Sequence, residues 1–155
     1  MPELSSKEIK NGLFQIMDAN LNRAREGLRV CEDIVRFVIS DKTDARMLKY
    51  IRHRITDVII GSKKQFLKKF ISARDTEKDY LKFIDMPFQK QPADLKNLFM
   101  ANMERAKESL RVLEECARLF DKGISNKYRK LRFALYNIEK RIAGHYVFAK
   151  KYDTD

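Results

Sequence analysis

Apolar residues recur at helical spacing along most of this chain, and the pattern predicts an all-α protein. In the first segment, from about residue 7 to residue 40, six apolar side chains fall on one face of a helix turning 100° per residue: Met17, Leu21, Ala24, Leu28, Cys31 and Val35. A second apolar stripe consists of Val30, Ile34 and Phe37. Because the segment is apolar on two sides, it is expected to be a central helix with neighbours on both.

Capping and turn signals divide the rest of the chain. Ser5 followed by Glu8 makes a capping box at the start of the first helix. Further helices are predicted at about 43–60, 62–72, 93–121 and 125–150. Their expected caps and ends are Ser40 or Asp41, Gly61, Gly123 and Ser125. Residues 73–92 lack clean periodicity and are predicted to form a long loop, a kind of segment that is often functional in a compact domain.

One block of the sequence occurs twice. Residues 19–36 (ANLNRAREGLRVCEDIVR) and 101–118 (ANMERAKESLRVLEECAR) align at an offset of 82 without a gap, and ten of the eighteen positions are identical. The repeat continues more weakly at an offset of about 80, around residues 48–52. Each half, about 13–60 and 95–142, is therefore predicted to be a long helical hairpin. Two such hairpins related by pseudo-twofold symmetry give a helical bundle with one additional short helix, in a single domain 1–155.

Composition and charge narrow the functional classes. The 155 residues are 44% apolar, which excludes disorder and allows one domain with a real core. No apolar run approaches the ~20 residues needed to cross a membrane, and the first residues lack a signal-peptide pattern. Cys31 and Cys116 lie inside apolar helical patterns, which indicates reduced core residues and a cytoplasmic protein. The net charge of +11 indicates an anionic partner.

The identical positions of the repeat are mainly polar and have two interpretations. Their conserved types are Asn, Arg and Glu: Asn20, Arg23, Glu26 and Arg29 in the first copy, and Asn102, Arg105, Glu108 and Arg111 in the second. The spacing suits a lattice of ion pairs along and between helices. The same residues suit a pocket for a phosphorylated ligand, because guanidinium groups bind phosphate in a bidentate manner. Asparagine is a mediocre helix former, so its recurrence in mid-helix favours a specific hydrogen bond.

Further candidate residues lie outside the repeated block. Asp75 and Asp79 follow Arg74 in the long loop, and two carboxylates beside an arginine suit Mg²⁺ next to a phosphate, with an ordinary polar turn as the alternative. His53 follows Arg52 on the second helix, where a structural histidine is the commoner case. The sequence contains no glycine-rich nucleotide loop, zinc motif or nucleophile elbow. It also contains no aromatic-interleaved basic strand typical of an RNA-binding sheet.

Several strings together resemble a known family. They are MDANLNRAREGLRVCEDIVRF, Leu48-Lys49 through Arg52-His53-Arg54, Ala73-Arg74-Asp75-Thr76 with Asp79, and ANMERAKESLRVLEE. They are similar to a small helical domain of the bacterial thiamine pathway, which often occurs fused in front of thiamine-phosphate synthase and sometimes alone. The resemblance covers roughly residues 13–142. The family pattern after the loop threonine continues Asp-Val-Gly, whereas this chain has Asp79-Tyr80-Leu81, and it has Glu104 where the family usually has lysine.

The resemblance implies a kinase that converts hydroxymethylpyrimidine phosphate to the pyrophosphate with ATP and Mg²⁺. On this hypothesis Arg23, Arg29, Arg105 and Arg111 bind the phosphates of ATP and of the acceptor. Asn20, Asn102, Arg52, His53, Arg74 and Thr76 bind the substrate, and Glu26, Glu108, Asp75 and Asp79 position Mg²⁺. The acceptor is already a phosphate, so the difficulty is bringing two anions together, which arginines and Mg²⁺ address.

Two other functions remain open at this point. One is a non-catalytic accessory or regulatory domain, which the missing nucleotide-binding motif favours. The other is a basic nucleic-acid-binding bundle, which rests on the net charge alone; the balance of Arg with Glu suits a bounded polar pocket better. The expected partner is thus a small phosphorylated pyrimidine, with neither nucleic acid nor a membrane. Helices that are apolar on two sides often dimerise, so a homodimer is compatible with the pattern.

Overall fold

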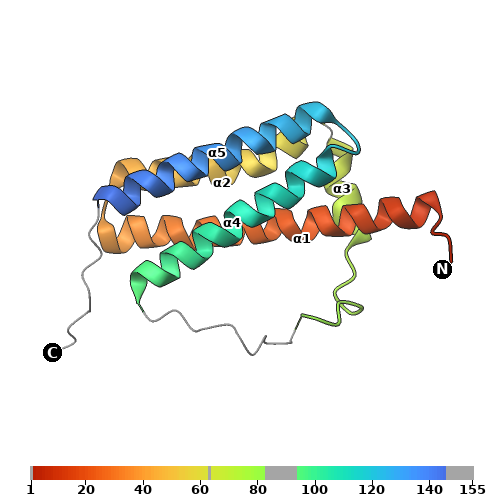
Figure 1. Cartoon of the computed structure of the whole chain (residues 1–155), viewed down its shortest axis with the longest axis horizontal. Helices are drawn as coiled ribbons and strands as arrows, with labels where there is room; N and C mark the ends of the chain where they lie inside the picture. Colours follow the sequence, from red (N-terminus) through yellow and green to blue (C-terminus); the bar gives the residue numbers. More distant parts are fainter. Residues whose placement is uncertain (1, 63, 83–93, 146–155) are drawn as a thin grey trace.

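The computed structural model describes residues 2–62, 64–82 and 94–145. Within these residues every regular element is helical, which confirms the all-α prediction (Figure 1). In chain order the elements are α1 (Ser6–Asp33), the π-helical turn η1 (Ile34–Ile39), α2 (Lys42–Ser62), α3 (Lys64–Ala73), α4 (Leu95–Ala117) and α5 (Lys122–His145). None of the described helices has the length and apolar character that crossing a lipid bilayer requires.

The four long helices form two antiparallel hairpins, α1 with α2 and α4 with α5, as the repeat predicts (Figure 1). α1 packs chiefly against α4, and α2 packs against α5, so the two hairpins lie face to face. The short helix α3 contacts both α1 and α2 at one end of the bundle. The segment that follows α3 therefore lies beside the N-terminal half of α1 (Figure 1).

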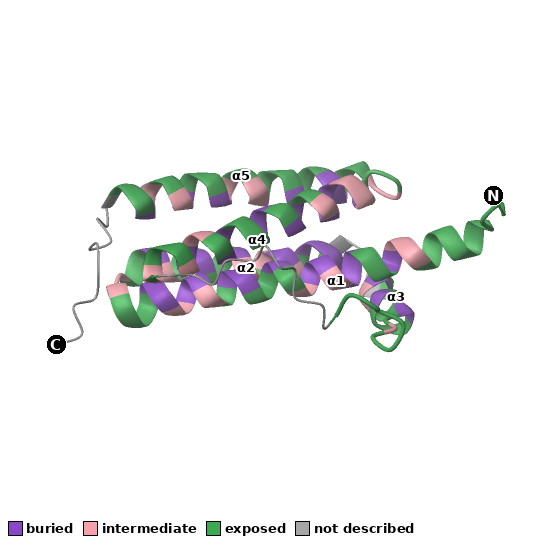
Figure 2. Cartoon of the chain, turned by 60° about the horizontal axis from the view of Figure 1, so that its bottom comes forward, coloured by how far each residue is buried: buried purple, intermediate pink, exposed green. Residues whose placement is uncertain are grey.

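The first apolar stripe of α1 is buried along its whole length, as the spacing predicts. Buried and exposed positions alternate around the helix in Figure 2. The helix begins with the expected capping box, in which the Ser5 hydroxyl accepts a hydrogen bond from the Glu8 backbone N–H at 3.2 Å and the Glu8 carboxylate accepts one from the Ser5 backbone N–H at 2.8 Å. This end of the helix is fixed by local chemistry.

The second stripe is only partly correct. Ile34 is buried, but Phe37 is 66% exposed. The reason is the π-helical turn η1, in which the backbone hydrogen bonds span one residue more than in an α-helix. The wider turn rotates Phe37 away from the face that α-helical spacing assigns to it. Ser40 then ends the turn with a left-handed backbone, φ 62°.

Glycine at position 27 allows α1 and α4 to approach closely. A Cβ atom on Gly27 would lie 2.7 Å from the backbone carbonyl oxygen of Asn102, closer than real Cβ contacts come. The position equivalent to Gly27 in the second half is Ser109, which is also buried. Small residues at both positions therefore set the separation of the two repeat helices.

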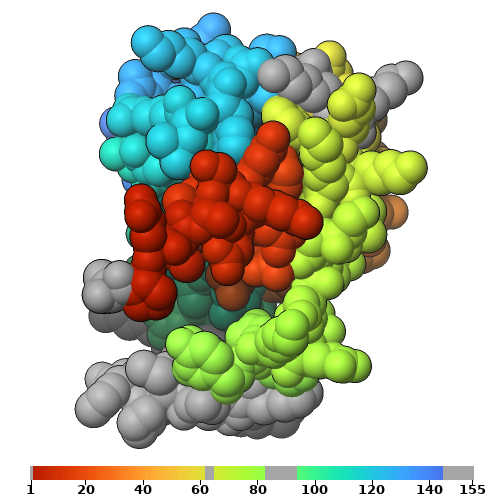
Figure 3. All heavy atoms as spheres, turned by 90° about the vertical axis from the view of Figure 1, so that its right-hand side faces the viewer, coloured from red at the N-terminus to blue at the C-terminus, as the bar shows by residue number. Residues whose placement is uncertain are grey.

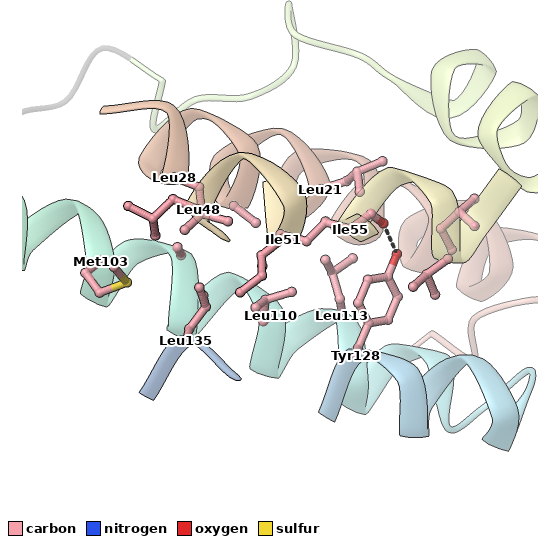
Figure 4. Packing of buried hydrophobic residues seen from close by; sticks show 14 of the residues in the cluster. Leu21, Leu28, Leu48, Ile51, Ile55, Met103, Leu110, Leu113, Tyr128 and Leu135 are labelled. Atoms are coloured by element: carbon pink, nitrogen blue, oxygen red, sulfur yellow. Dashed lines mark hydrogen bonds between the residues drawn. The ribbon is translucent and has the colours of Figure 1, made fainter. Parts of the chain in front are cut away.

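The core lies between the two hairpins (Figure 4). Leucine and isoleucine side chains from α1, α2, α4 and α5 fill it, and Tyr128 reaches across from α5 to donate its hydroxyl to the Ile55 carbonyl oxygen at 3.3 Å. A separate aromatic cluster fixes α3. The Phe14 ring on α1 contacts Phe66 and Phe70 on α3, with centroids 5.9 and 5.6 Å away. This cluster sets where the segment after α3 emerges.

Three predicted helix ends differ from the structure. α2 continues through Gly61, and α4 ends at Ala117, before the expected Gly123. Gly123 and Ser125 both lie inside α5, because Asp121 accepts hydrogen bonds from the backbone N–H groups of Gly123 and Ile124 and so begins that helix earlier. The Ser125 hydroxyl donates instead to the buried Glu114 carbonyl oxygen at 2.9 Å. The predicted continuation of the last helix to residue 150 lies outside the described residues.

Candidate functional site

A groove of about 620 Å³ lies between the N-terminal half of α1 and the segment that follows α3. Figure 3 shows the end of the molecule where the red start of α1 and the yellow-green residues of α3 and the following segment lie next to each other. From α1 the lining residues are Asn11, Gln15, Ile16, Asp18, Ala19, Asn20, Asn22 and Arg23. From the segment after α3 they are Arg74, Asp75, Thr76, Lys78 and Asp79.

Six of the predicted site residues meet in this groove although more than fifty positions separate the two stretches that supply them. They are Asn20, Arg23, Arg74, Asp75, Thr76 and Asp79. The groove is thus built from one end of the repeated block and from the loop that the sequence marks as a candidate.

Two contacts fix the loop to α1. The Gln15 amide donates to the Ala73 carbonyl oxygen at 2.8 Å, where α3 ends. The Arg74 guanidinium makes a bidentate pair with the buried Asp18 carboxylate, with both N···O distances 2.7 Å. The hydrogen bond to Asp18 raises the pKa of Arg74 above its usual value. Two of the five guanidinium N–H groups are used in this pair, so the others remain for a ligand.

The loop itself is held by local hydrogen bonds. The Asp75 carboxylate accepts from the Lys78 backbone N–H at 3.2 Å, and this bond lowers the pKa of Asp75 below its usual value. Asp79 accepts from the Leu81 backbone N–H at 3.2 Å. The Lys82 ammonium donates to the Thr76 carbonyl oxygen at 2.6 Å. These hydrogen bonds fix the turn, and both carboxylates line the groove. Because its pKa is lowered, Asp75 is ionised at neutral pH.

The lining carries both signs of charge. Arg23, Arg74 and Lys78 supply positive groups, and Asp18, Asp75 and Asp79 supply negative ones. Among the described residues no three His, Cys, Asp or Glu side chains gather into a ready-made metal site. Mg²⁺ in phosphate-binding enzymes is commonly held by one or two carboxylates together with substrate phosphates. Asp75 and Asp79 fit that donor set.

Asn20 and Asn102 make the same hydrogen bond in the two halves. Each side-chain amide donates to the carbonyl oxygen four residues earlier, Ile16 at 2.8 Å and Leu98 at 2.9 Å. Both residues are buried. Arg105 lies on α4 and donates weakly to the Asn102 amide oxygen at 3.5 Å. Neither Asn102 nor Arg105 lines the groove.

Arg29 and Arg111 lie in ion pairs within their own helices, and Arg52 lies in a pair that joins α2 to α1. The lattice interpretation expects pairs of both kinds. The repeated Glu32 and Glu114 are both buried. The Arg52 guanidinium on α2 meets Glu32 at 2.7 Å, and its equivalent on α5, Arg132, meets Glu114 at 2.9 Å. Each carboxylate therefore clamps the two helices of its own hairpin.

Two exposed arginines of the repeat, Arg29 and Arg111, form their ion pairs along their own helices. Arg29 pairs with Asp33 at 3.2 Å, and Arg111 pairs with Glu115 at 2.9 Å. Arg29 and Arg111 are half-exposed and lie apart from the groove lining. Glu26, Glu108 and His53 are exposed and also lie outside it. The site role of these residues stays a prediction.

Sequence reasoning missed one part of the groove, a polar stripe on α1. Asn11, Gln15, Asp18 and Asn22 follow each other at intervals of four, three and four residues, which places them on one helix face. The signal was present as polar residues at helical spacing opposite the apolar stripe. It was missed because such residues on a helix most often face solvent.

Fold and groove together define an all-α domain of two repeated helical hairpins with a polar, mixed-charge groove at one end. The ThiD2 family model matches residues 15–141, and the chain belongs to this family, a domain of the thiamine pathway. This confirms the resemblance drawn from the repeated block and the loop.

Curated relatives carry the same domain inside longer proteins. Thiamine-phosphate synthase of Nostoc sp. (strain PCC 7120) is 33% identical over 144 residues, which are 93% of this chain and 39% of that protein. Thiamine-phosphate synthase of Synechococcus sp. (strain CC9311) is 35% identical over 135 residues, 87% of this chain and 36% of that protein. The chain thus spans less than two-fifths of the length of these relatives. No solved structure matches it.

Proposed function

We propose that this domain is an ATP- and Mg²⁺-dependent kinase that phosphorylates hydroxymethylpyrimidine phosphate to the pyrophosphate. The observation that carries the proposal is the groove, which gathers Asn20, Arg23 and the 74–79 loop in a space of about 620 Å³. Membership of a thiamine-pathway family supplies the class of substrate.

The chemistry of the groove suits transfer between two anions. Arg23 makes no ion pair with a carboxylate in the described parts of the chain, so its guanidinium is available for a phosphate. Arg74 is held in place by Asp18 and keeps free N–H groups. Asp75 and Asp79 would hold Mg²⁺, which when bound neutralises phosphate charge as the phosphoryl group moves. A phosphate acceptor needs no strong general base, and none is required here.

The polar stripe supplies the other part of recognition. Asn11, Gln15 and Asn22 line the groove with amide groups, which both donate and accept hydrogen bonds. The ring nitrogens of a pyrimidine accept hydrogen bonds, so the N–H groups of these amides suit its edge. The charged end of the groove then receives the phosphate.

The test measures ADP release from Mg·ATP with hydroxymethylpyrimidine phosphate, and with the unphosphorylated pyrimidine as the control substrate. Release with the phosphorylated substrate alone is expected. Arg23→Gln should lower kcat/KM by roughly 100-fold, because it removes a charge that stabilises the transferred group. Arg105→Gln is the matched control, the same change at the equivalent repeat position outside the groove. Equal losses in both variants would refute the assignment of the groove.

A second function has its own support. The relatives carry this domain as about two-fifths of proteins named thiamine-phosphate synthase, so it could act as an accessory module to that enzyme. An accessory module predicts no binding of Mg·ATP. The kinase predicts thermal stabilisation, by about 2.7 kcal/mol when free Mg·ATP is 100 times its Kd. The absence of both stabilisation and ADP release, in folded protein, would decide for the accessory module.

A further inference from the structure

A second hollow lies at the opposite end of α1 from the groove, and four of its six lining residues are basic. It measures about 220 Å³ and is formed by Glu32 and Arg36 near the end of the first helix with Lys42, Ala45, Arg46 and Lys49 on α2. It shares no residue with the groove. Nine residues separate Arg23 from Glu32 along the helix, a distance of about 14 Å.

The positive charge of this hollow is unbalanced. Four cationic side chains line it, and within the described part of the chain none of them forms an ion pair with a carboxylate. The one carboxylate in the lining, Glu32, is already paired with Arg52 at 2.7 Å. Arg36 has its guanidinium over the Phe37 ring at 4.8 Å, a contact that leaves its charge uncompensated. Like charges gathered around one hollow repel each other, so an anion between them would relieve a real cost.

The second half of the protein shows how the equivalent positions are paired there. Arg118, the equivalent of Arg36, pairs with Glu115 at 3.4 Å. Arg129, the equivalent of Lys49 at an offset of 80, pairs with Glu114 at 2.9 Å. The position equivalent to Arg46 is Asn126. At three of the four positions the second copy has therefore paired or lost the charge that the first copy leaves unpaired, and Lys122 keeps the charge of Lys42.

The backbone differs between the halves at the same place. The offset between repeats is 82 on the first helix of each hairpin and 80 on the second, so the first half holds two more residues between them. These residues lie where α1 widens into η1 and Ser40 adopts its left-handed backbone. In the second half α4 ends directly at Ala117. Because π-helical turns recur at functional sites, this local irregularity is a second sign that the first half is specialised here.

We propose that this hollow, the α1–α2 basic hollow, is a binding site for a diphosphate group, separate from the groove. Four cations around about 220 Å³ suit a small ligand with several negative oxygens. The Glu32 carboxylate in its lining is paired with Arg52, and this pair joins α1 to α2. The diphosphate group comes either as free inorganic diphosphate or as part of a nucleotide. The site does not depend on the kinase proposal, since it lies on other residues.

The experiment is a titration of the ¹⁵N-labelled full chain followed by amide chemical shifts. Inorganic diphosphate is added in one series and ADP without Mg²⁺ in another, at low ionic strength, where screening is weak. The expected result is a cluster of saturable shifts at residues 36–49 with inorganic diphosphate. Shifts of the same amides with ADP would identify the nucleotide as a further source of the group.

Variants make the test specific. Arg36→Gln with Arg46→Gln should weaken diphosphate binding at residues 36–49 by about tenfold or more, since each substitution removes a charged hydrogen-bond donor. Arg118→Gln, the matched change at the equivalent position, should leave it unaltered. Both sites are exposed, and the unperturbed part of the spectrum reports folding. Shifts confined to the groove, or an equal loss in the Arg118 variant, would overturn the proposal.

Discussion

Replacing Gly27 by alanine tests the closest approach in the structure. The added Cβ would lie 2.7 Å from the Asn102 carbonyl oxygen and 3.5 Å from the Ala106 nitrogen. Both atoms are backbone of α4, so no flexible side chain can move aside. The two helices would have to separate by at least 0.3 Å to reach even the 3.0 Å that real Cβ atoms essentially never cross.

The magnitude follows from two opposing effects. Alanine is the better helix former and gains about 1 kcal/mol over glycine within a helix. Overfilling a close-packed contact costs typically ~1–3 kcal/mol, and here the loss extends along the α1–α4 contact, the most extensive in the bundle. We expect Gly27→Ala to destabilise the protein by about 1–2 kcal/mol in net terms.

Gly12→Ala is the matched control on the same helix. A Cβ at Gly12 would meet nothing within 4 Å, so only the propensity gain remains, and this variant should be more stable by about 0.4–1 kcal/mol. Urea unfolding followed by circular dichroism measures both, with the m value checking that the unfolded states are comparable. If Gly27→Ala proved as stable as Gly12→Ala, α1 and α4 would not approach as closely as the structure has them.

Three further predictions concern buried groups. Burial raises the pKa of Glu114, but the hydrogen bonds from Arg129 and Arg132 outweigh it and hold the pKa below its usual value. This carboxylate therefore stabilises the fold at neutral pH and loses that contribution as pH falls below about 4.5. Glu114→Gln should lower neutral-pH stability by about 3 kcal/mol and flatten the acid limb of the stability–pH curve, whereas an unchanged curve would contradict the clamp. Asn20→Ala and Asn102→Ala should cost similar stability, about 1 kcal/mol or more, but only Asn20→Ala should raise the KM for the substrate in the ADP-release assay. Burial raises the pKa of the Cys31 thiol to about 12, so a thiol reagent at pH 8 should leave Cys31 unmodified in the folded protein and label it once urea is added.

The sequence predicted the parts of this fold that rest on local chemistry. The capping box at Ser5 and the buried stripe of α1 both follow from residues within a few positions of each other. Phe37 was misplaced because its orientation depends on the π-helical turn, which leaves no sign in apolar spacing. The start of α5 was misplaced because the Asp121 carboxylate, and not Ser125, accepts the hydrogen bonds at the beginning of that helix.

The sequence predicted several residues of the groove, but not how they are arranged in space. The pattern of the long loop marked Arg74, Asp75 and Asp79, and the repeat marked Asn20 and Arg23. Only the structure shows that Asp18 positions Arg74, since that pair joins residues fifty-six positions apart. It also separates Arg23, which lines the groove, from Arg105, its equivalent by sequence, which does not. Equal residues in a repeat need not have equal surroundings.

The residues that the two halves share and the segments that only one half has differ in what they do. What the two halves share is mostly structural: each has a buried glutamate clamping its hairpin, and each has an asparagine bonded to its own helix. What makes the groove is the stretch without a counterpart in the repeat, α3 and the loop after it, which lies beside only one of the two repeat helices. The α1–α2 basic hollow likewise occurs where the first half departs from the second. Symmetry in this sequence therefore identifies the residues that hold the bundle together, and the departures from symmetry identify where we propose that it binds its ligands.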